Sequence, residues 1–337
     1  SELMLVTFGR AATSELRDRV RERLVSAERA LRDPAVRRSD DALLRHLADV
    51  DDTELDARRR RLTRALAEFD RATIATTHGF CQQMLATLGI AGDTDPDAVL
   101  LPDVADLREE VVDDLYLQRY AVEREPGLSV TDARAVARAA VSDHDADLRP
   151  TDATGSADHR YRFAADVRAE IVRRKRARRL IDYDDLLTLL RDALTHPQTG
   201  PAAVERVRSR YRVVMVDEFQ DTDRVQWDIL RTAFHGHRTL VLIGDPKQAI
   251  YAFRGADVVT YLAARRDAHD TATLGRNWRS DAAVLEGLHH VLGTTALGDR
   301  RIVVRRVEAQ HTGRRHDGAA AVRLRQVTRA ALGTPSG

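Results

Sequence analysis

Two adjacent carboxylates follow a short apolar run in the second half of the chain. Residues 213–216 are typical of a buried parallel strand, and Asp217 and Glu218 come directly after it. Ligands bind at the carboxyl edge of such sheets, so both side chains would be within reach of a nucleotide. An Asp in this place commonly holds Mg²⁺, and a neighbouring Glu can orient and deprotonate an attacking water. The alternative is that the two carboxylates only begin a solvated loop.

The elements that would position these carboxylates are further strands of the same kind. Residues 239–243 form a second apolar run, which also ends in polar residues, Gly244 to Gln248. A third run, residues 3–8, precedes a charged helix over residues 11–31, whose apolar residues recur at helical spacing and should face the sheet. These patterns predict an α/β domain built on a parallel sheet.

Length and composition exclude several other classes of protein. The chain has 337 residues, room for two or three domains, and its hydrophobic content of 43% supports real cores. No stretch approaches the roughly 18 unbroken apolar residues of a membrane helix. The single cysteine, Cys81, excludes an internal disulfide framework and favours a reducing, cytoplasmic location. A net charge of +1 gives no global argument for nucleic-acid binding.

Three ordered strings extend the first motif: Asp217 to Thr222, Gly244 to Asp257, and Asn277 to Ser280. They resemble motifs II, III and IV of superfamily 1 DNA helicases of the UvrD/Rep type, and their wording is most similar to RecB-like helicases. The resemblance implies a P-loop NTPase fold. It consists of a RecA-like parallel-sheet domain with a helical insertion, followed by the start of a second RecA-like domain.

The resemblance also implies a nucleotide site that uses ATP and Mg²⁺ as cofactors. Asp217 would hold the metal and Glu218 would be the base for the attacking water. Gln248 would sense the γ-phosphate. Trp278 would stack on the adenine ring, and Arg279 would act as an arginine finger, which can contribute on the order of 10³ to 10⁵ in rate.

A second set of residues would contact DNA. Strings at residues 7–16 and 72–81 resemble motifs Ia and Ib, and the segment after Gln248 offers two aromatic rings and an arginine on which single-stranded bases could stack. Core packing is the alternative for the two rings, and a local hydrogen-bonding role is the alternative for the histidine. The candidate DNA contacts are Thr7, Phe8, Thr77, His78, Tyr251, Phe253 and Arg254.

The resemblance and the pattern of breaks divide the chain into segments. We expect a first RecA-like domain in two parts, residues 1–90 and 181–265, an inserted helical subdomain at 91–180, and the start of a second RecA-like domain at 266–337. Residues 40–71 are predicted to form one helix.

Smaller features of these segments carry predictions of their own. The run Arg173 to Arg179 could neutralise DNA phosphates or form a solvated helix face. Asp182, Asp184 and Asp185 are explained better by a helix start than by a metal site. In the last segment, the apolar residues of 301–307 and 320–327 predict two strands.

A Gly-rich phosphate loop of the form Gly-x-x-x-x-Gly-Lys-Ser/Thr is absent from these residues. We therefore expect an internal or N-terminally truncated fragment, without motifs V and VI or a nuclease domain, that does not hydrolyse ATP alone. The parent would be an ATP-dependent 3′→5′ helicase of a RecBCD-type helicase-nuclease in double-strand-break repair and recombination. Its partners would be single-stranded and duplex-end DNA and RecC-like and RecD-like subunits, with no membrane partner. The alternatives are another superfamily 1 helicase, of the UvrD or AddA type, and a non-catalytic DNA-binding subunit.

Overall fold

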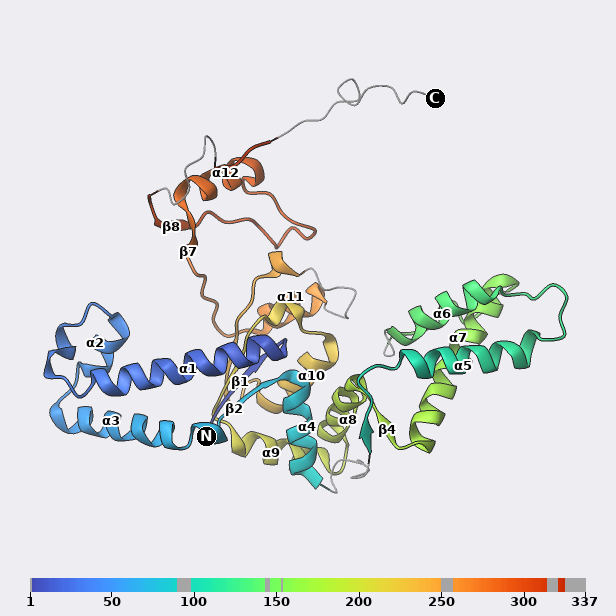
Figure 1. Cartoon of the computed structure of the whole chain (residues 1–337), viewed down its shortest axis with the longest axis horizontal. Helices are drawn as coiled ribbons and strands as arrows, with labels where there is room; N and C mark the ends of the chain where they lie inside the picture. The colour runs from blue at the N-terminus through green and yellow to red at the C-terminus, as the bar shows by residue number, and fades with distance from the viewer. Residues whose placement is uncertain are drawn as a thin grey trace. The chain divides into compact units, whose positions relative to one another are not determined.

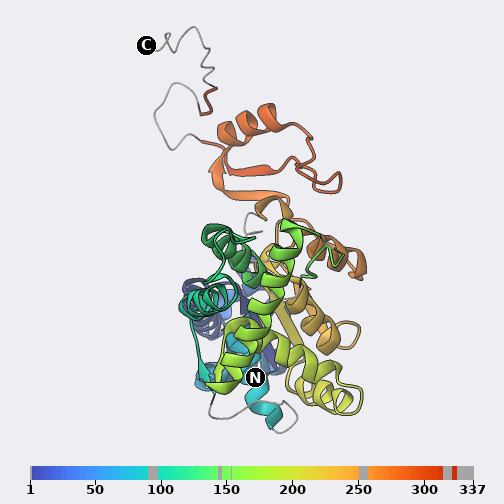
Figure 2. The ribbon, with the colours of Figure 1, turned by 90° about the vertical axis from the view of Figure 1, so that its right-hand side faces the viewer.

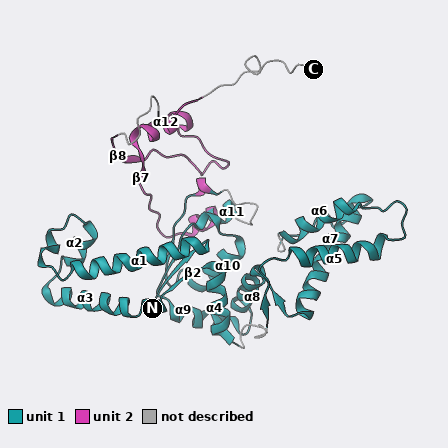
Figure 3. Ribbon diagram, in the orientation of Figure 1, with its two compact units in different colours: residues 1–245, 249–261 teal, residues 246–248, 262–337 magenta. Residues whose placement is uncertain are grey.

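The fold was analysed in a computed structural model, which describes residues 2–89, 98–142, 146–152, 154–249, 257–313 and 321–324. The chain divides into two compact units, coloured separately in Figure 3. Unit 1 comprises residues 1–245 and 249–261, and unit 2 comprises residues 246–248 and 262–337.

A four-stranded parallel sheet forms the centre of unit 1, as the sequence predicts. The strand order is β2-β1-β5-β6, and Val214 lies opposite both Met4 of β1 and Leu240 of β6. Because all strands are parallel, their carboxyl ends meet at one edge. The strands are β1 (Leu3–Thr7), β2 (Thr73–Thr76), β5 (Val213–Val216) and β6 (Thr239–Leu242).

Helix α1 (Arg10–Ala30) covers one face of this sheet. Its side chains at helical spacing pack against the strand residues Leu5 and Ile74, as the periodicity predicts. These side chains are Leu16, Val20 and Leu24. Alternate strand residues, such as Met4 and Val214, point to the other face and are fully buried there.

The segment between β1 and β2 is a helical hairpin in which α1 and α3 lie side by side (Figure 1). The prediction of one helix over residues 40–71 is wrong, because a turn at Asp49 to Asp51 separates two helices. The carboxylate of Asp51 accepts a hydrogen bond from the Glu54 backbone N–H and thereby starts the second helix. The elements are η1 (Pro34–Arg38), α2 (Ala42–Ala48), α3 (Asp52–Ala67) and η2 (Phe69–Arg71).

A bundle of four further helices packs on one another, and Figure 2 shows α8 to α10 gathered beside the sheet. Phe80 and Cys81 of this bundle are buried, so the cysteine is a small core residue. The helices are α4 (Thr77–Leu88), α8 (Tyr183–Thr195), α9 (Gly200–Arg210) and α10 (Arg224–Phe234).

In the part of the predicted insertion that the structure describes, three helices share a core of their own, and they lie together in Figure 1. Val111, Ala137, Phe163 and Val167 are fully buried in that core. A two-stranded parallel ladder, β3 (Val99–Leu100) with β4 (Leu180–Ile181), joins the two ends of the insertion. The helices are α5 (Ala105–Tyr120), α6 (Val130–Ser142) and α7 (Ser156–Ala177).

Unit 2 contains a parallel strand pair, β7 (Arg276–Asp281) and β8 (Glu308–His311), with α12 (Ala282–Leu292) packed on both. The prediction of a strand at residues 301–307 is wrong. Only Val303 forms a bridge there, and the strand begins at Glu308, where β7 offers backbone partners. The strand predicted at 320–327 lies largely outside the described residues. Helix α11 (Val258–Asp267) contributes residues to both units.

Within the described ranges, no helix is both long enough and apolar enough to cross a membrane.

Candidate functional site at the carboxyl edge of the sheet

Backbone hydrogen bonds hold the predicted catalytic pair at the edge where three strands end. Asp217 N donates to Val6 O at 2.8 Å, so the first carboxylate follows β5 directly beside the end of β1. On the other side, Phe219 N donates to Ile243 O, also at 2.8 Å. The Asp217 side chain is half-buried and the Glu218 side chain is exposed. These backbone hydrogen bonds therefore place both carboxylates at the carboxyl edge of the sheet, as the sequence predicts.

Glu218 adopts a left-handed backbone conformation, with φ 52° and ψ 40°. Such a conformation costs a residue with a side chain about 1–3 kcal/mol and persists only where the surroundings impose it. Of the residues that the structure describes, only Arg179 shares this feature among non-glycine residues. The turn after β5 thus carries strain at the residue proposed as the base.

Gln220 connects Glu218 to the neighbouring strand end. Its side chain is buried, Nε2 donates to Glu218 Oε2 at 2.6 Å, and Oε1 accepts from Asp245 N at 3.0 Å. A Cβ added to Gly244 would lie 2.7 Å from Gln220 Oε1, so only glycine leaves room for this link. The two predicted motifs, after β5 and after β6, are joined through one amide.

Asp221 is a buried carboxylate behind this turn. Among the described residues its Oδ1 has no hydrogen-bond partner. Burial, and then the charge of Glu218, raise the pKa of Asp221 above its ordinary value. The short turn η4 (Phe219–Asp221) is anchored by Phe219, whose ring packs on Trp227 and Tyr261 at centroid distances of 5.6 and 6.0 Å.

At the end of β1, Thr7 is 2% exposed, and its hydroxyl lies 2.6 Å from that of Thr13. This burial assigns the Thr7 side chain to the local turn around Gly9, whose carbonyl it also meets at 3.3 Å. The predicted contact of Thr7 with DNA stays a prediction. Phe8 is half-buried beside it, and its contact with DNA stays a prediction.

Sequence reasoning missed two residues at this edge, Arg10 and Tyr183. Arg10 Nη2 donates to Tyr183 Oη at 2.7 Å, and the tyrosine ring meets His78 edge-on with centroids 5.0 Å apart. Burial lowers the pKa of His78, so its ring is neutral near pH 7. Thr77 begins α4 next to it. Tyr183 thus brings together residues of the Ia-like and Ib-like strings. No pattern in the sequence indicates this contact, because it depends on how distant segments fold against each other.

The remaining candidates lie in unit 2 or outside the described residues. Gln248 ends the short turn η5 (Pro246–Gln248) and is exposed. In β7, Asn277 Oδ1 accepts from Arg279 N at 2.9 Å and from Ser280 N at 2.8 Å, which fixes the bend that carries Arg279. Trp278 is 66% exposed, so its ring face is accessible. The predicted stacking residues Tyr251, Phe253 and Arg254 lie outside the described part of the chain.

Comparison with known proteins identifies the family. The model of the UvrD/REP helicase N-terminal domain matches residues 1–269. The chain belongs to the UvrD/Rep helicase family. Its RecA-like P-loop fold agrees with the parallel sheet described above, and both confirm the predicted fold class.

Within this UvrD/Rep family, two mycobacterial RecB subunits are similar to the chain over nearly its whole length. It is 51% identical over 334 residues to the RecBCD enzyme subunit RecB of Mycolicibacterium smegmatis, covering 97% of this chain and 30% of that protein. Identity to the RecB subunit of Mycobacterium tuberculosis is 48% over 338 residues, covering 98% of the chain and 30% of the relative. The Escherichia coli subunit is 43% identical over 136 residues, 40% of the chain and 11% of the relative. The chain therefore spans about 30% of the length of its two mycobacterial relatives, and the predicted RecB-like resemblance is confirmed.

The site of this UvrD/Rep-type helicase chain fits a magnesium nucleotide. Carboxylate oxygens are the ligands that Mg²⁺ prefers, and Mg²⁺ usually takes only one or two of them, with water and substrate phosphates completing its shell. Asp217 could supply such a ligand, which leaves the Glu218 carboxylate for the attacking water. Within the described residues no group of three or more His, Cys, Asp and Glu could hold a metal by itself.

The basic run in α7 of the insertion is largely neutralised by acidic side chains. Arg174 bonds Glu110, Asp114 and Glu170 at 2.7 Å each, and Arg178 also bonds Glu110. These contacts favour a structural role for the run over phosphate binding. Further along, Asp182 and Asp185 form a capping box at the start of α8, which confirms the predicted helix start, and Lys175 bonds both.

Proposed function

We propose that the chain provides the water-activating part and a DNA-gripping part of an ATP-driven DNA helicase. The observation that carries the proposal is the placement of Asp217 and Glu218 at the carboxyl edge of the sheet, tied to the next strand end through Gln220. Family membership supports the reaction class, because these helicases couple nucleotide hydrolysis to movement on DNA.

In the proposed mechanism Asp217 would hold Mg²⁺, which neutralises charge on the phosphates when it is bound. Glu218 would orient the attacking water and accept its proton. The hydrogen bond from Gln220 restricts the Glu218 carboxylate to one orientation, so little reorganisation is needed during the reaction. Because Gln220 also holds Asp245, it would transmit movement of the segment before Gln248 to the base.

The nucleotide would also contact residues of unit 2. Trp278 would stack on the base, Arg279 would reach the phosphates as an arginine finger, and Gln248 would sense the γ-phosphate. The exposure of Trp278 and the Asn277-fixed bend at Arg279 are compatible with these roles.

On the DNA side, Phe8, Thr77 and His78 would contact the single strand together with Arg10 and Tyr183, and Tyr251, Phe253 and Arg254 would stack on its bases. Thr7, whose hydroxyl lies against Gly9 O and the Thr13 hydroxyl, would contact the strand from the same turn. We propose that the helicase moves along DNA in the 3′→5′ direction and acts in double-strand-break repair. It would do so within a helicase-nuclease that also contains RecC-like and RecD-like subunits. The similarity to RecB subunits of RecBCD enzymes supports this proposal.

A phosphate loop with its lysine has to be supplied for hydrolysis, because these 337 residues contain no such sequence. The test therefore uses a chimera in which this chain replaces the matching segment of the Mycolicibacterium smegmatis RecB subunit. The chimera should unwind partial duplexes that carry a 3′ single-stranded tail in preference to those with a 5′ tail. Asp217→Asn should abolish unwinding, whereas Asp228→Asn in α10 should not. Equal unwinding by both variants, or a preference for 5′ tails, would reject the proposal.

A further inference from the structure

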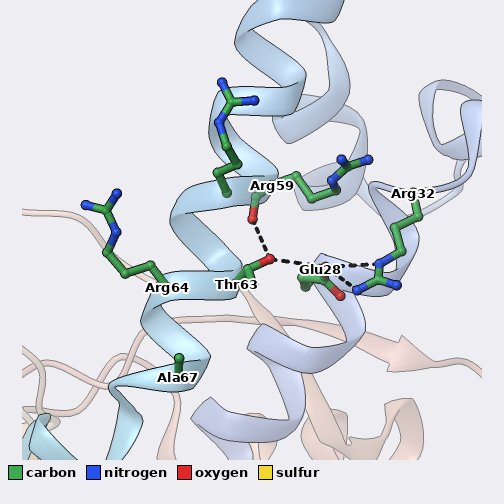
Figure 4. A pocket seen from close by; sticks show the side chains of 7 residues that line it. Glu28, Arg32, Arg59, Thr63, Arg64 and Ala67 are labelled. Atoms are coloured by element: carbon green, nitrogen blue, oxygen red, sulfur yellow. Dashed lines mark hydrogen bonds and ion pairs between the residues drawn. The ribbon is translucent and has the colours of Figure 1, made fainter.

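The helical hairpin between β1 and β2 contains an open hollow of about 630 Å³, between the end of α1 and the middle of α3. Four arginines dominate its lining: Arg32, Arg59, Arg60 and Arg64 (Figure 4). The hollow lies outside every string that resembles a helicase motif. It also differs from the run in α7, because two of its four arginines, Arg60 and Arg64, have no ion-pair partner among the described residues.

The only carboxylate in the lining, Glu28, is already engaged. Glu28 is 6% exposed, and its carboxylate accepts from Arg32 Nη2 at 2.8 Å and from Thr63 Oγ1 at 3.3 Å (Figure 4). The hydrogen bond from Arg32 lowers the pKa of Glu28, so the carboxylate is ionised near pH 7. Glu28 therefore neutralises one guanidinium group of the hollow, that of Arg32, and does not neutralise the other three.

The other three arginines are weakly paired. Arg59 approaches Asp56 at 3.4 Å on the exposed side of α3. Arg60 and Arg64 are exposed, and neither side chain makes a hydrogen bond or ion pair with any residue that the structure describes. They stand four residues apart, about 6 Å along the helix axis, and so face the same side of α3. The hollow thus gathers uncompensated guanidinium groups on one surface.

We propose that this hollow binds the phosphodiester backbone of nucleic acid. Guanidinium groups match phosphate oxygens in geometry and charge, and an open hollow with four of them suits several successive phosphates better than one small anion. An acidic protein segment is the competing ligand. Protein interfaces are anchored by buried aromatic and aliphatic side chains, whereas Ala67 is the only apolar residue in this lining. The assignment goes beyond the proposed helicase function, because it adds a contact that the helicase-like strings do not contain.

The test measures binding of labelled single-stranded and duplex oligonucleotides to the 337-residue chain by fluorescence anisotropy at several salt concentrations. The double variant Arg60→Gln/Arg64→Gln should bind about tenfold more weakly. The slope of log affinity against log salt should fall by about 1.4 for single strands or about 1.8 for duplex. The matched control is Arg38→Gln/Arg231→Gln, which removes two exposed arginines outside the hollow and should leave both quantities nearly unchanged. Equal losses in the two double variants would overturn the proposal.

For a third variant we predict the opposite change in DNA affinity, an increase. Glu28→Gln keeps the shape of the side chain but removes its charge, so Arg32 becomes available to phosphate, and the affinity for DNA should rise. A purely structural role for the arginines would leave DNA affinity unchanged in this variant. Polyglutamate serves as the probe for an acidic protein ligand. If it binds more tightly than DNA and loses affinity in Arg60→Gln/Arg64→Gln, the hollow is a protein-docking site and the nucleic-acid assignment is wrong.

Discussion

Gln220 holds Glu218 by a hydrogen bond of 2.6 Å from its side-chain amide to the glutamate carboxylate. The same amide accepts the backbone N–H of Asp245, so the residue proposed as the base is connected to the end of the adjacent strand. A buried amide with both ends satisfied is rigid, and the loss of either end would leave an unpaired polar group. The relationship gives Glu218 a fixed position despite its strained backbone.

Replacing Gln220 should therefore affect both stability and catalysis. Gln220→Ala should lower the free energy of unfolding by about 1–3 kcal/mol, because it leaves buried groups unpaired. In the chimera it should also lower DNA-stimulated ATP hydrolysis at least about tenfold, since Glu218 loses its orientation.

The matched control is Gln226→Ala in α10. Gln226 is also buried, and its side chain donates to Asp223 Oδ2 at 2.7 Å, but it does not contact Glu218. The control should show a similar loss of stability in urea unfolding with near-normal hydrolysis per folded molecule. A parallel loss of hydrolysis in both variants would mean that Gln220 acts only through stability.

Asp221 should give the protein a specific dependence of stability on pH. Its folded-state pKa is raised, chiefly by burial, so the folded protein binds its proton more tightly than the unfolded chain does. Folding stability is then greatest below the unfolded-state pKa and decreases as the pH rises through the interval up to the folded-state pKa.

Asp221→Asn removes this titration. We expect the variant to be more stable than the unchanged protein near pH 7, and the difference to shrink as the pH falls through the raised folded-state pKa towards the ordinary value of 3.8. Urea unfolding of both proteins across this pH range measures the difference between their free energies of unfolding. The contributions of other titrating groups are the same in both proteins and cancel in this difference. A difference that is constant with pH, or that grows in acid, would show that burial does not raise the Asp221 pKa.

Lys175 should be important for the stability of the junction between α7 and α8. Its ammonium group is largely buried and lies 2.7 Å from both Asp182 and Asp185. Lys175→Met leaves two carboxylates without their cation and should cost about 3–5 kcal/mol. Arg173→Met, on the same helix, removes an exposed pair with Glu170 and should cost about 0–1 kcal/mol. Thermal unfolding compares the two, and equal costs would contradict the account.

Local sequence chemistry was sufficient to predict the sheet and several helix starts. An apolar run that ends in carboxylates indicated β5, and the cluster of Asp182, Asp184 and Asp185 indicated the start of α8, because these signals act within a few residues. The turn between α2 and α3 carried a similar signal, Asp51 with Glu54 three residues later, which a search for helix caps would have found.

Contacts between distant segments were beyond sequence reasoning. The basic run of α7 is neutralised by Glu110, more than sixty residues earlier, and this pairing depends on how α5 and α7 pack. Likewise, the Arg10–Tyr183 hydrogen bond joins residues 173 positions apart. The strand misplaced at 301–307 has the same cause, since backbone partners in β7, not side-chain pattern, determine where β8 forms.

The most direct test of the proposed function is ATP hydrolysis by the chimera carrying Glu218→Gln, measured with saturating single-stranded DNA. Glu205→Gln, which changes an exposed glutamate of α9, is the control. If Glu218 is the base, its replacement should lower kcat by about 10²- to 10⁴-fold with ATP binding retained, while the control hydrolyses ATP normally. A Glu218→Gln chimera whose kcat matches that of the control would contradict the assignment of Glu218 as the base.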